Sequence, residues 1–277
     1  MNKLRMYGTI IVLCLFAMLM FKPMSVQAKT LKSGKTYTQY DVTGDKKKDK
    51  FKITLDKKDK DGWNHRINLF INGRRYKLKS GGILDAEATI VKLKNGNIYI
   101  NVIDASGTAG SFQINSLYQY KKGKLVKVLD LTVNKQKCLN LANRLILKVS
   151  GNTLVVEEDE VNTALGVGIY IFNYNYKNGK FVKENIGKIK NIGFEDHDGC
   201  RGTMRRTKTL YTSPNFKKAL GKIKAGEKAD AIRIYLTKNK ISIKLKTKDG
   251  RTGWVKCNNK QEVSKYIFKG CYYENVA

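Results

Sequence analysis

The sequence has few of the residues on which hydrolytic catalysis depends. It contains only two histidines, and the one that follows Cys138, His197, lies in an acidic segment, so a cysteine peptidase is not indicated. The Gly-x-Ser-x-Gly pattern is absent, and no spacing resembles a zinc site. The paired carboxylates of a glycoside hydrolase can be recognised only by the distance between them in the folded protein. These absences favour binding over catalysis.

Long apolar runs are also scarce, and the one that stands out lies at the N-terminus. Thr9–Phe21 is an apolar run of about 13 residues, preceded by Lys3 and Arg5 and followed by the small-residue end Val26-Gln27-Ala28. This run is shorter than the roughly 20 residues that span a bilayer. The pattern is typical of an export signal cleaved after Ala28, with a retained helical anchor as the alternative.

Acidic residues are outnumbered by basic ones. The chain has 54 Lys and Arg against 23 Asp and Glu, a net charge of +31, and removal of the leader leaves about +28. Such a charge favours anionic partners, and in an exported setting these would be teichoic acids, anionic lipid headgroups or acidic glycans. Nucleic acid fits the charge but not the location. Alternatively, the dispersed lysines are a solubilising coat, since only Lys46–Lys48, Arg74-Arg75 and Arg205-Arg206 form local runs.

Four cysteines remain after the leader: Cys138, Cys200, Cys257 and Cys271. Outside the cell an even number favours disulfides, and four cysteines allow three pairings. We expect a bridge between Cys257 and Cys271, or between Cys200 and one of these two. Free thiols are the alternative.

Helical periodicity is nearly absent, whereas strand patterns occur throughout. Two-residue turn signals such as Asn72-Gly73, Asn95-Gly96 and Asn178-Gly179 favour hairpins. β-branched and aromatic residues alternate or cluster in segments that we expect to be strands: Phe51–Leu55, Asn97–Ile103, Leu145–Val149, Ile232–Leu236 and Ile241–Leu245.

One segment repeats within the chain. Tyr118–Lys127 recurs as Tyr174–Lys183, and each copy reads as a hairpin preceded by a second one, which gives units of about four strands. Phe51–Leu78 could be a shorter first unit. Four-stranded units at this spacing are typical of propeller blades. Three units are too few for a closed propeller. The alternatives are an incomplete ring, a sandwich of the units, or association of several molecules.

Asp41–Asp49 spaces side-chain oxygens at positions one, three, five and nine, as calcium needs from a short loop. Followed by a strand, it resembles the calcium loops of FG-GAP and VCBS-type repeats. That resemblance implies five ligands, of which Lys47 would donate its carbonyl: Asp41, Thr43, Asp45, Lys47 and Asp49. A metal-free Asx turn of the same shape is the alternative.

The C-terminal region carries a second resemblance. Thr209–Pro214, Lys224–Ala229 and the hairpin Lys246–Lys256 with its Gly turn and Trp254 occur in the order seen in bacterial SH3 modules. These modules are binding domains, and their exposed aromatic side chains often bind cell-wall peptides. The resemblance therefore implies ligand contacts by Tyr211 and Trp254, with Tyr235 as a neighbour. Alternatively, Trp254 fills the core of a small barrel.

Two acidic segments are interpreted as structural. Glu195–Gly199, with His197, is expected to be a solvated linker, although a metal or acid–base role is open. Glu157–Glu160 is expected to form a strand end or loop that balances nearby lysines.

Together these features predict an all-β protein, with a propeller-like or sandwich-like β-repeat domain followed by a small SH3-like barrel. The expected divisions are a signal peptide at 1–28, a β-repeat domain at 29–199 and an SH3-like domain at 200–277. We expect a secreted, non-enzymatic protein that binds peptidoglycan, teichoic acid or another anionic glycan at the cell wall. The alternatives are an accessory module for another secreted protein, or a glycan-active enzyme with an unrecognised carboxylate site.

Overall fold

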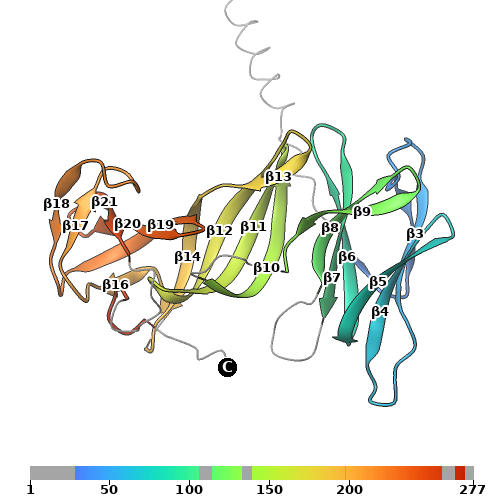
Figure 1. The fold of residues 1–277 in the computed structure, drawn as a ribbon, viewed down its shortest axis with the longest axis horizontal. Coiled ribbons are helices and arrows are strands. Elements are labelled where there is room, and N and C mark those ends of the chain that lie inside the picture. Colours follow the sequence, from blue (N-terminus) through green and yellow to red (C-terminus); the bar gives the residue numbers. More distant parts are fainter. Residues whose placement is uncertain (1–28, 106–113, 133–138, 197, 258–265, 272–277) are drawn as a thin grey trace, which may run out of the picture.

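The structure, a computed structural model, describes residues 29–105, 114–132, 139–196, 198–257 and 266–271. In these residues the chain forms 21 strands and no helix, arranged in three antiparallel sheets (Figure 1). The predicted all-β class is therefore confirmed. No helix in this part of the chain is long and apolar enough to cross a membrane. The predicted signal peptide, Cys138 and His197 lie outside the described residues.

The first sheet, here the N-terminal sheet, has four strands in the order β2-β3-β4-β5. Its strands are β2 (Thr36–Tyr40), β3 (Asp49–Leu55), β4 (Asn64–Ile71) and β5 (Arg74–Ile83). Alternation along β3 and β4 turns Phe51, Ile53, Ile67, Leu69 and Ile71 to one face, where all five are buried. The opposite face carries polar and basic side chains.

The middle sheet has five strands in the order β1-β6-β7-β8-β9 and lies between the other two sheets (Figure 1). Its strands are β1 (Lys29–Lys32), β6 (Asp85–Lys92), β7 (Ile98–Ala105), β8 (Asn115–Lys121) and β9 (Lys124–Asp130). On β7, Ile100 and Val102 join the core shared with the N-terminal sheet, whereas Tyr99 joins the core on the other side. Both faces of this sheet are therefore packed.

The C-terminal sheet has 12 strands. Nine of them follow the order β10-β11-β12-β14-β19-β20-β21-β17-β18, while β13 pairs with β12, β15 with β14 and β16 with β19. The strands are β10 (Leu139–Ser150), β11 (Thr153–Asn162), β12 (Gly166–Lys177), β13 (Lys180–Lys183), β14 (Ile186–Gly193), β15 (Asp198–Gly199), β16 (Arg201–Thr203), β17 (Lys208–Tyr211), β18 (Ala219–Ile223), β19 (Lys228–Thr237), β20 (Lys240–Thr247) and β21 (Thr252–Lys256).

The hairpins expected from the internal repeat are present. Lys121 pairs with Lys124 at the end of β8 and β9, and Lys177 pairs with Lys180 at the end of β12 and β13. The two central residues of each turn, Lys122-Gly123 and Asn178-Gly179, all have positive φ. The two hairpins pack together through β9 and β13, and Tyr99 on the neighbouring β7 contacts the ring of Phe181 in β13 at 5.2 Å between ring centroids.

The predicted boundary at residue 199 does not coincide with a break in the sheet. β14, which precedes it, pairs with β19, which follows it, through Ile186–Tyr235, Gly187–Ile234 and Lys188–Arg233. None of the three sheets closes on itself in the described pairing. The division into two domains stays a prediction.

The predicted disulfide among the C-terminal cysteines is not formed, since Cys200, Cys257 and Cys271 are free thiols. Cys257 and Cys271 are buried in the core of the C-terminal sheet, and burial raises the pKa of each thiol to about 12. Cys200 is half-buried, with its Sγ 3.4 Å from the carbonyl oxygen of Lys190. The three sulfur atoms therefore lie in separate surroundings and are not bridged.

The β14–β19 junction generates a test of stability. A Cβ on Gly187 would lie 2.7 Å from the ring of Phe172, so we expect Gly187→Ala to reduce the free energy of unfolding by about 1–3 kcal/mol through overpacking. Gly199→Ala is the matched control, because its Cβ would meet nothing within 4 Å. Urea denaturation measures both. Equal stability of the two variants would contradict the packing described here.

Candidate functional site

The predicted calcium loop folds around two carboxylates that accept backbone hydrogen bonds. Asp41 accepts from the N–H groups of Gly44, Asp45 and Lys46 at 2.6, 3.1 and 2.9 Å. The buried Asp49 accepts from the N–H groups of Val42 and Thr43 at 2.7 and 2.8 Å. Both carboxylates replace backbone acceptors within the loop, whereas the bond from the Lys47 N–H to Asp45 is an Asx turn in the strict sense.

Asp49 and Asp45 accept further hydrogen bonds. Asp49 accepts from Asn72 Nδ2 at 2.6 Å, and Asp45 accepts from the Lys47 N–H at 2.8 Å. Lys46, which stands where calcium loops usually carry glycine, has a φ of 69°. The described residues contain no group of three or more metal-ligating side chains. In this arrangement the carboxylates of Asp41, Asp45 and Asp49 accept backbone N–H donors, and calcium binding stays a prediction.

The three aromatic residues singled out from the sequence gather at one end of the C-terminal sheet. Tyr211 on β17 pairs with Trp254 on β21, and the rings of Tyr235 and Trp254 meet edge-on at 6.5 Å between centroids. Tyr211 and Tyr235 are half-buried, whereas Trp254 is only 5% exposed. The structure therefore brings the three residues together, with Trp254 packed in the core and the two tyrosines reaching the surface.

Two further residues, Phe216 and Lys240, complete this aromatic cluster and were not identified from the sequence. The ring of Phe216 lies 5.1 Å from that of Tyr211. The Lys240 ammonium lies 4.3 Å from the Phe216 ring centroid and 5.7 Å from that of Tyr235. A cation at these distances is attracted to the ring faces. We call Tyr211, Phe216, Tyr235, Trp254 and Lys240 the aromatic cluster.

Phe216 has a φ of 60°, in the left-handed region that a bulky side chain rarely adopts. Its N–H donates to the Ser213 carbonyl oxygen at 3.0 Å, which closes a turn through Pro214 and Asn215. The turn residues in the sequence are the signal that could have located this position. Strain of this kind often accompanies function, and here it places an aromatic ring at the surface.

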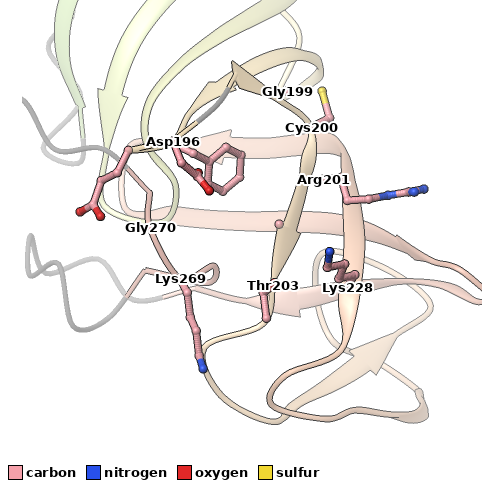
Figure 2. A pocket seen from close by; sticks show the side chains of 11 residues that line it. Asp196, Gly199, Cys200, Arg201, Thr203, Lys228, Lys269 and Gly270 are labelled. Atoms are coloured by element: carbon pink, nitrogen blue, oxygen red, sulfur yellow. The ribbon is translucent and has the colours of Figure 1, made fainter.

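A hollow lies elsewhere on the C-terminal sheet. It has a volume of about 640 Å³ and is lined by β15, β16 and the segment around Gly270 (Figure 2). Glu195 and Asp196, which line one wall, are exposed. Arg201 extends away from that wall (Figure 2) and forms an ion pair with Asp230 at 2.8 Å. A general acid usually needs burial to retain its proton at neutral pH, which these exposed carboxylates lack.

The acidic run at Glu157–Glu160 is not the loop or strand end that the sequence suggested. It lies inside β11, and alternation along the strand buries Glu158 and Glu160 completely. Two adjacent acids on the buried face of a strand are costly unless they are paired or neutral. The run balances nearby charges as expected, but inside the protein.

Glu158 is the ionised member of this pair. It accepts from the Tyr174 hydroxyl at 2.6 Å and forms ion pairs with Lys183 and Arg144. Burial alone would raise its pKa, but Glu160, Lys183 and Arg144 together lower it to about 2.

Burial and the neighbouring Glu158 carboxylate raise the pKa of Glu160 well above its usual value. Burial thus favours the protonated form of Glu160, whose Oε1 lies 4.0 Å from the Arg144 guanidinium. Its environment resembles that of catalytic acids, but complete burial separates it from any substrate. We interpret the pair as structural.

No protein-family model, no curated protein and no solved structure matches this chain.

Glu158→Gln is expected to reduce the free energy of unfolding at pH 7 by about 3 kcal/mol, because it leaves buried Lys183 and Arg144 without their counter-charge. In Glu160→Gln a neutral amide replaces the protonated carboxyl group. This variant should change the free energy of unfolding by less than about 1 kcal/mol. Urea denaturation of both variants at pH 7 provides the comparison. Equal losses would show that the two acids do not differ in charge.

The pH dependence of stability follows from the same pair. The pKa of Glu158 is lower in the folded protein than its ordinary 4.5, so its contribution is complete above pH 4.5 and is lost as the pH falls towards 2. The raised pKa of Glu160 acts in the opposite sense, and its contribution is lost as the pH rises through the folded-state value. Denaturation curves recorded from pH 2 to pH 5 should show the first effect, and Glu158→Gln should remove it.

For the acidic loop, Asp49→Ala should destabilise the protein by about 2–3 kcal/mol, because it leaves the buried N–H of Val42 and the half-buried N–H of Thr43 without an acceptor. Asp45→Ala is the control and should have a much smaller effect, since this exposed side chain accepts only from Lys47. Thermal melts with and without millimolar calcium complete the test. We expect calcium to leave the melting temperature unchanged; a rise that Asp45→Ala abolishes would establish the calcium site.

Proposed function

We propose that the protein is a secreted, non-enzymatic binding protein that associates with the cell wall, where it takes peptidoglycan, teichoic acid or another anionic glycan. The aromatic cluster is the observation that carries this proposal. It places Tyr211, Phe216 and Tyr235 at the surface of one end of the C-terminal sheet. Aromatic rings that are half-exposed and held in place bind ligands at little entropic cost.

An SH3-like arrangement of the C-terminal strands is part of the proposal. The hairpin of β17 and β18 adjoins β21, and β19, β20 and β21 follow one another in a meander. Trp254 lies on the last strand, after the turn at Gly250, whose φ is 86°. This order supports the resemblance noted in the sequence. The hairpins of the internal repeat support a repeat architecture for the preceding region.

Net charge supports an anionic component in the ligand. The chain carries a charge of +31, which raises the local concentration of polyanions at any distance within the screening length. The aromatic cluster contains a cation of its own, Lys240, which stands over two rings. Rings with an adjacent ammonium group suit a ligand that combines an apolar sugar or peptide face with a negative charge.

The carboxylates described above favour binding over glycan cleavage. Glu158 and Glu160 are sealed in the core, and Glu195 and Asp196 are exposed without the burial that a catalytic acid requires. The alternative of an accessory module for another secreted protein is an outcome of the experiment below.

Co-sedimentation with purified peptidoglycan sacculi, with and without teichoic acid, tests the proposal. We expect the protein without residues 1–28 to pellet with stripped sacculi at about 0.5 M salt, where screening leaves little purely ionic attraction. Phe216→Ala and Tyr235→Ala should each weaken this retention about tenfold, the loss expected for one well-placed aromatic contact.

The control is Leu220→Ala, which removes an exposed apolar side chain from β18, outside the aromatic cluster. Trp254→Ala is not informative alone, because the loss of this buried ring also destabilises the sheet. If high salt alone releases the protein from the sacculi, charge accounts for its retention. If the protein does not pellet with sacculi under any condition, a protein partner is favoured.

A further inference from the structure

The outer face of the N-terminal sheet concentrates basic side chains around one aromatic ring. On β3 the residues that alternate with the core are Lys50, Lys52 and Thr54; on β4 they are Arg66, Asn68 and Phe70; on β5 they are Arg75 and Lys77. Phe70 is half-buried, and its neighbours Ile67, Leu69 and Ile71 point to the opposite side, into the core. We call these eight residues the basic face.

Strand register arranges the basic face in rows. Lys52 on β3 stands opposite Phe70 on β4, and Phe70 stands opposite Arg75 on β5. In the next row, Asn68 stands between Thr54 and Lys77. Directly opposed side chains on neighbouring strands are in contact range, and two strand spacings separate β3 from β5 by about 10 Å. Phe70 is thus flanked by a cation on each side.

The surface is hollowed on both sides of Phe70. One hollow, of about 440 Å³, is lined by Phe70, Asn68 and the cations Arg66, Arg75 and Lys77. The other, of about 450 Å³, is lined by Phe70, Thr36, Lys50, Lys52 and Gly73. The ring forms a ridge between two shallow cationic depressions.

The cations of the basic face are available to a ligand. Among the ion pairs in the described part of the chain, none includes Lys50, Lys52, Arg66, Arg75 or Lys77. Asp56 is the single acid that lines either hollow, and its Oδ1 accepts the backbone N–H groups of His65 and Arg66. Five cations near one carboxylate form a surface complementary to a polyanion.

We propose that the basic face binds a linear anionic glycan or polyol polymer. An anionic group of the chain would occupy each hollow, and the sugar or polyol unit between them would pack on Phe70. The 10 Å between β3 and β5 leaves room for such a unit. The proposal deepens the proposed function, because it assigns the anionic part of the ligand to a surface of its own.

Other occupants fit this surface less well. A second copy of the chain would bring another highly cationic protein, with a charge of +31, against a cationic face. A flat lipid surface would reach the ridge of Phe70 but not the two depressions beside it. The hollows favour a chain that crosses the strands from one depression to the other.

Binding of soluble polymers tests this assignment without the wall. The probes are poly(glycerol phosphate), which carries phosphate groups, and polygalacturonate, which carries carboxylates. The Lys52→Gln, Arg75→Gln double variant should bind the preferred polymer about tenfold more weakly and should lower the slope of log affinity against log salt by about 1.5. Phe70→Ala should weaken the binding that remains at high salt, because it removes the contact that salt does not screen.

The matched control is the double variant Lys246→Gln, Lys248→Gln, which removes the same charge from exposed positions of the C-terminal sheet. Equal weakening by the two double variants would overturn the proposal, since net charge alone would then explain binding. Tighter binding of single-stranded DNA than of either polymer would overturn it in favour of a nucleic acid, and a protein-concentration-dependent dimer lost in the basic-face variants would overturn it in favour of a second copy.

The outcome is distinguishable from that of the proposed function. The fold-loss of polymer affinity caused by Lys52→Gln, Arg75→Gln should be the same with and without Phe216→Ala, because the two surfaces lie in different sheets. A protein that binds these polymers but does not pellet with stripped sacculi would support the basic face and refute wall binding by the aromatic cluster. The reverse result would refute the basic face alone.

Discussion

The pairing of β14 with β19 joins the strands up to β15 and the strands from β16 onward into one C-terminal sheet. Three residue pairs form this junction, and Gly187 is the central one. The ring of Phe172 fills the space that a side chain at residue 187 would take, and the Lys183 ammonium covers it at 3.8 Å from the ring centroid. Because Lys183 also neutralises Glu158, the junction, the buried ring and the buried acid form one packed unit.

Charge is distributed unevenly between the interior and the surface. Two of the few acids are buried on β11, so they do not balance the lysines outside. The free-energy cost of burying these two carboxyl groups is offset by contacts with Arg144, Lys183 and Tyr174, and by the raised pKa of Glu160, which favours its neutral form. The cluster therefore takes cations as well as acids out of the surface, and the basic face has a separate origin in the alternation along β3, β4 and β5.

Local features of the fold could be predicted from the sequence, whereas long-range ones could not. Alternation located Phe51–Leu55 in β3 and Ile241–Leu245 in β20, and Asn178-Gly179 marked its hairpin, because these signals depend on neighbouring residues. The β14–β19 pairing depends on residues some 47 positions apart, for which the sequence offers no local signal. The burial of Glu158 likewise depends on which face of β11 is covered.

The same distinction applies to the sites. Tyr211, Tyr235 and Trp254 were identified by resemblance and do lie together, but Phe216 was missed because its ring reaches the cluster through a left-handed turn. The alternation of Lys50, Lys52 and Thr54 was visible in the sequence, yet only the register of three strands shows that Phe70 stands among these cations.

The aromatic cluster and the basic face lie at opposite ends of an elongated molecule (Figure 1). Two surfaces so placed cannot compete for one short ligand, but a polymer network offers both of them a partner at once. Once the first surface is bound, the second meets its ligand at an effective concentration set by the distance between the two surfaces. Modest affinities at each end would then combine into long retention, and soluble fragments too short to reach both ends would dissociate quickly.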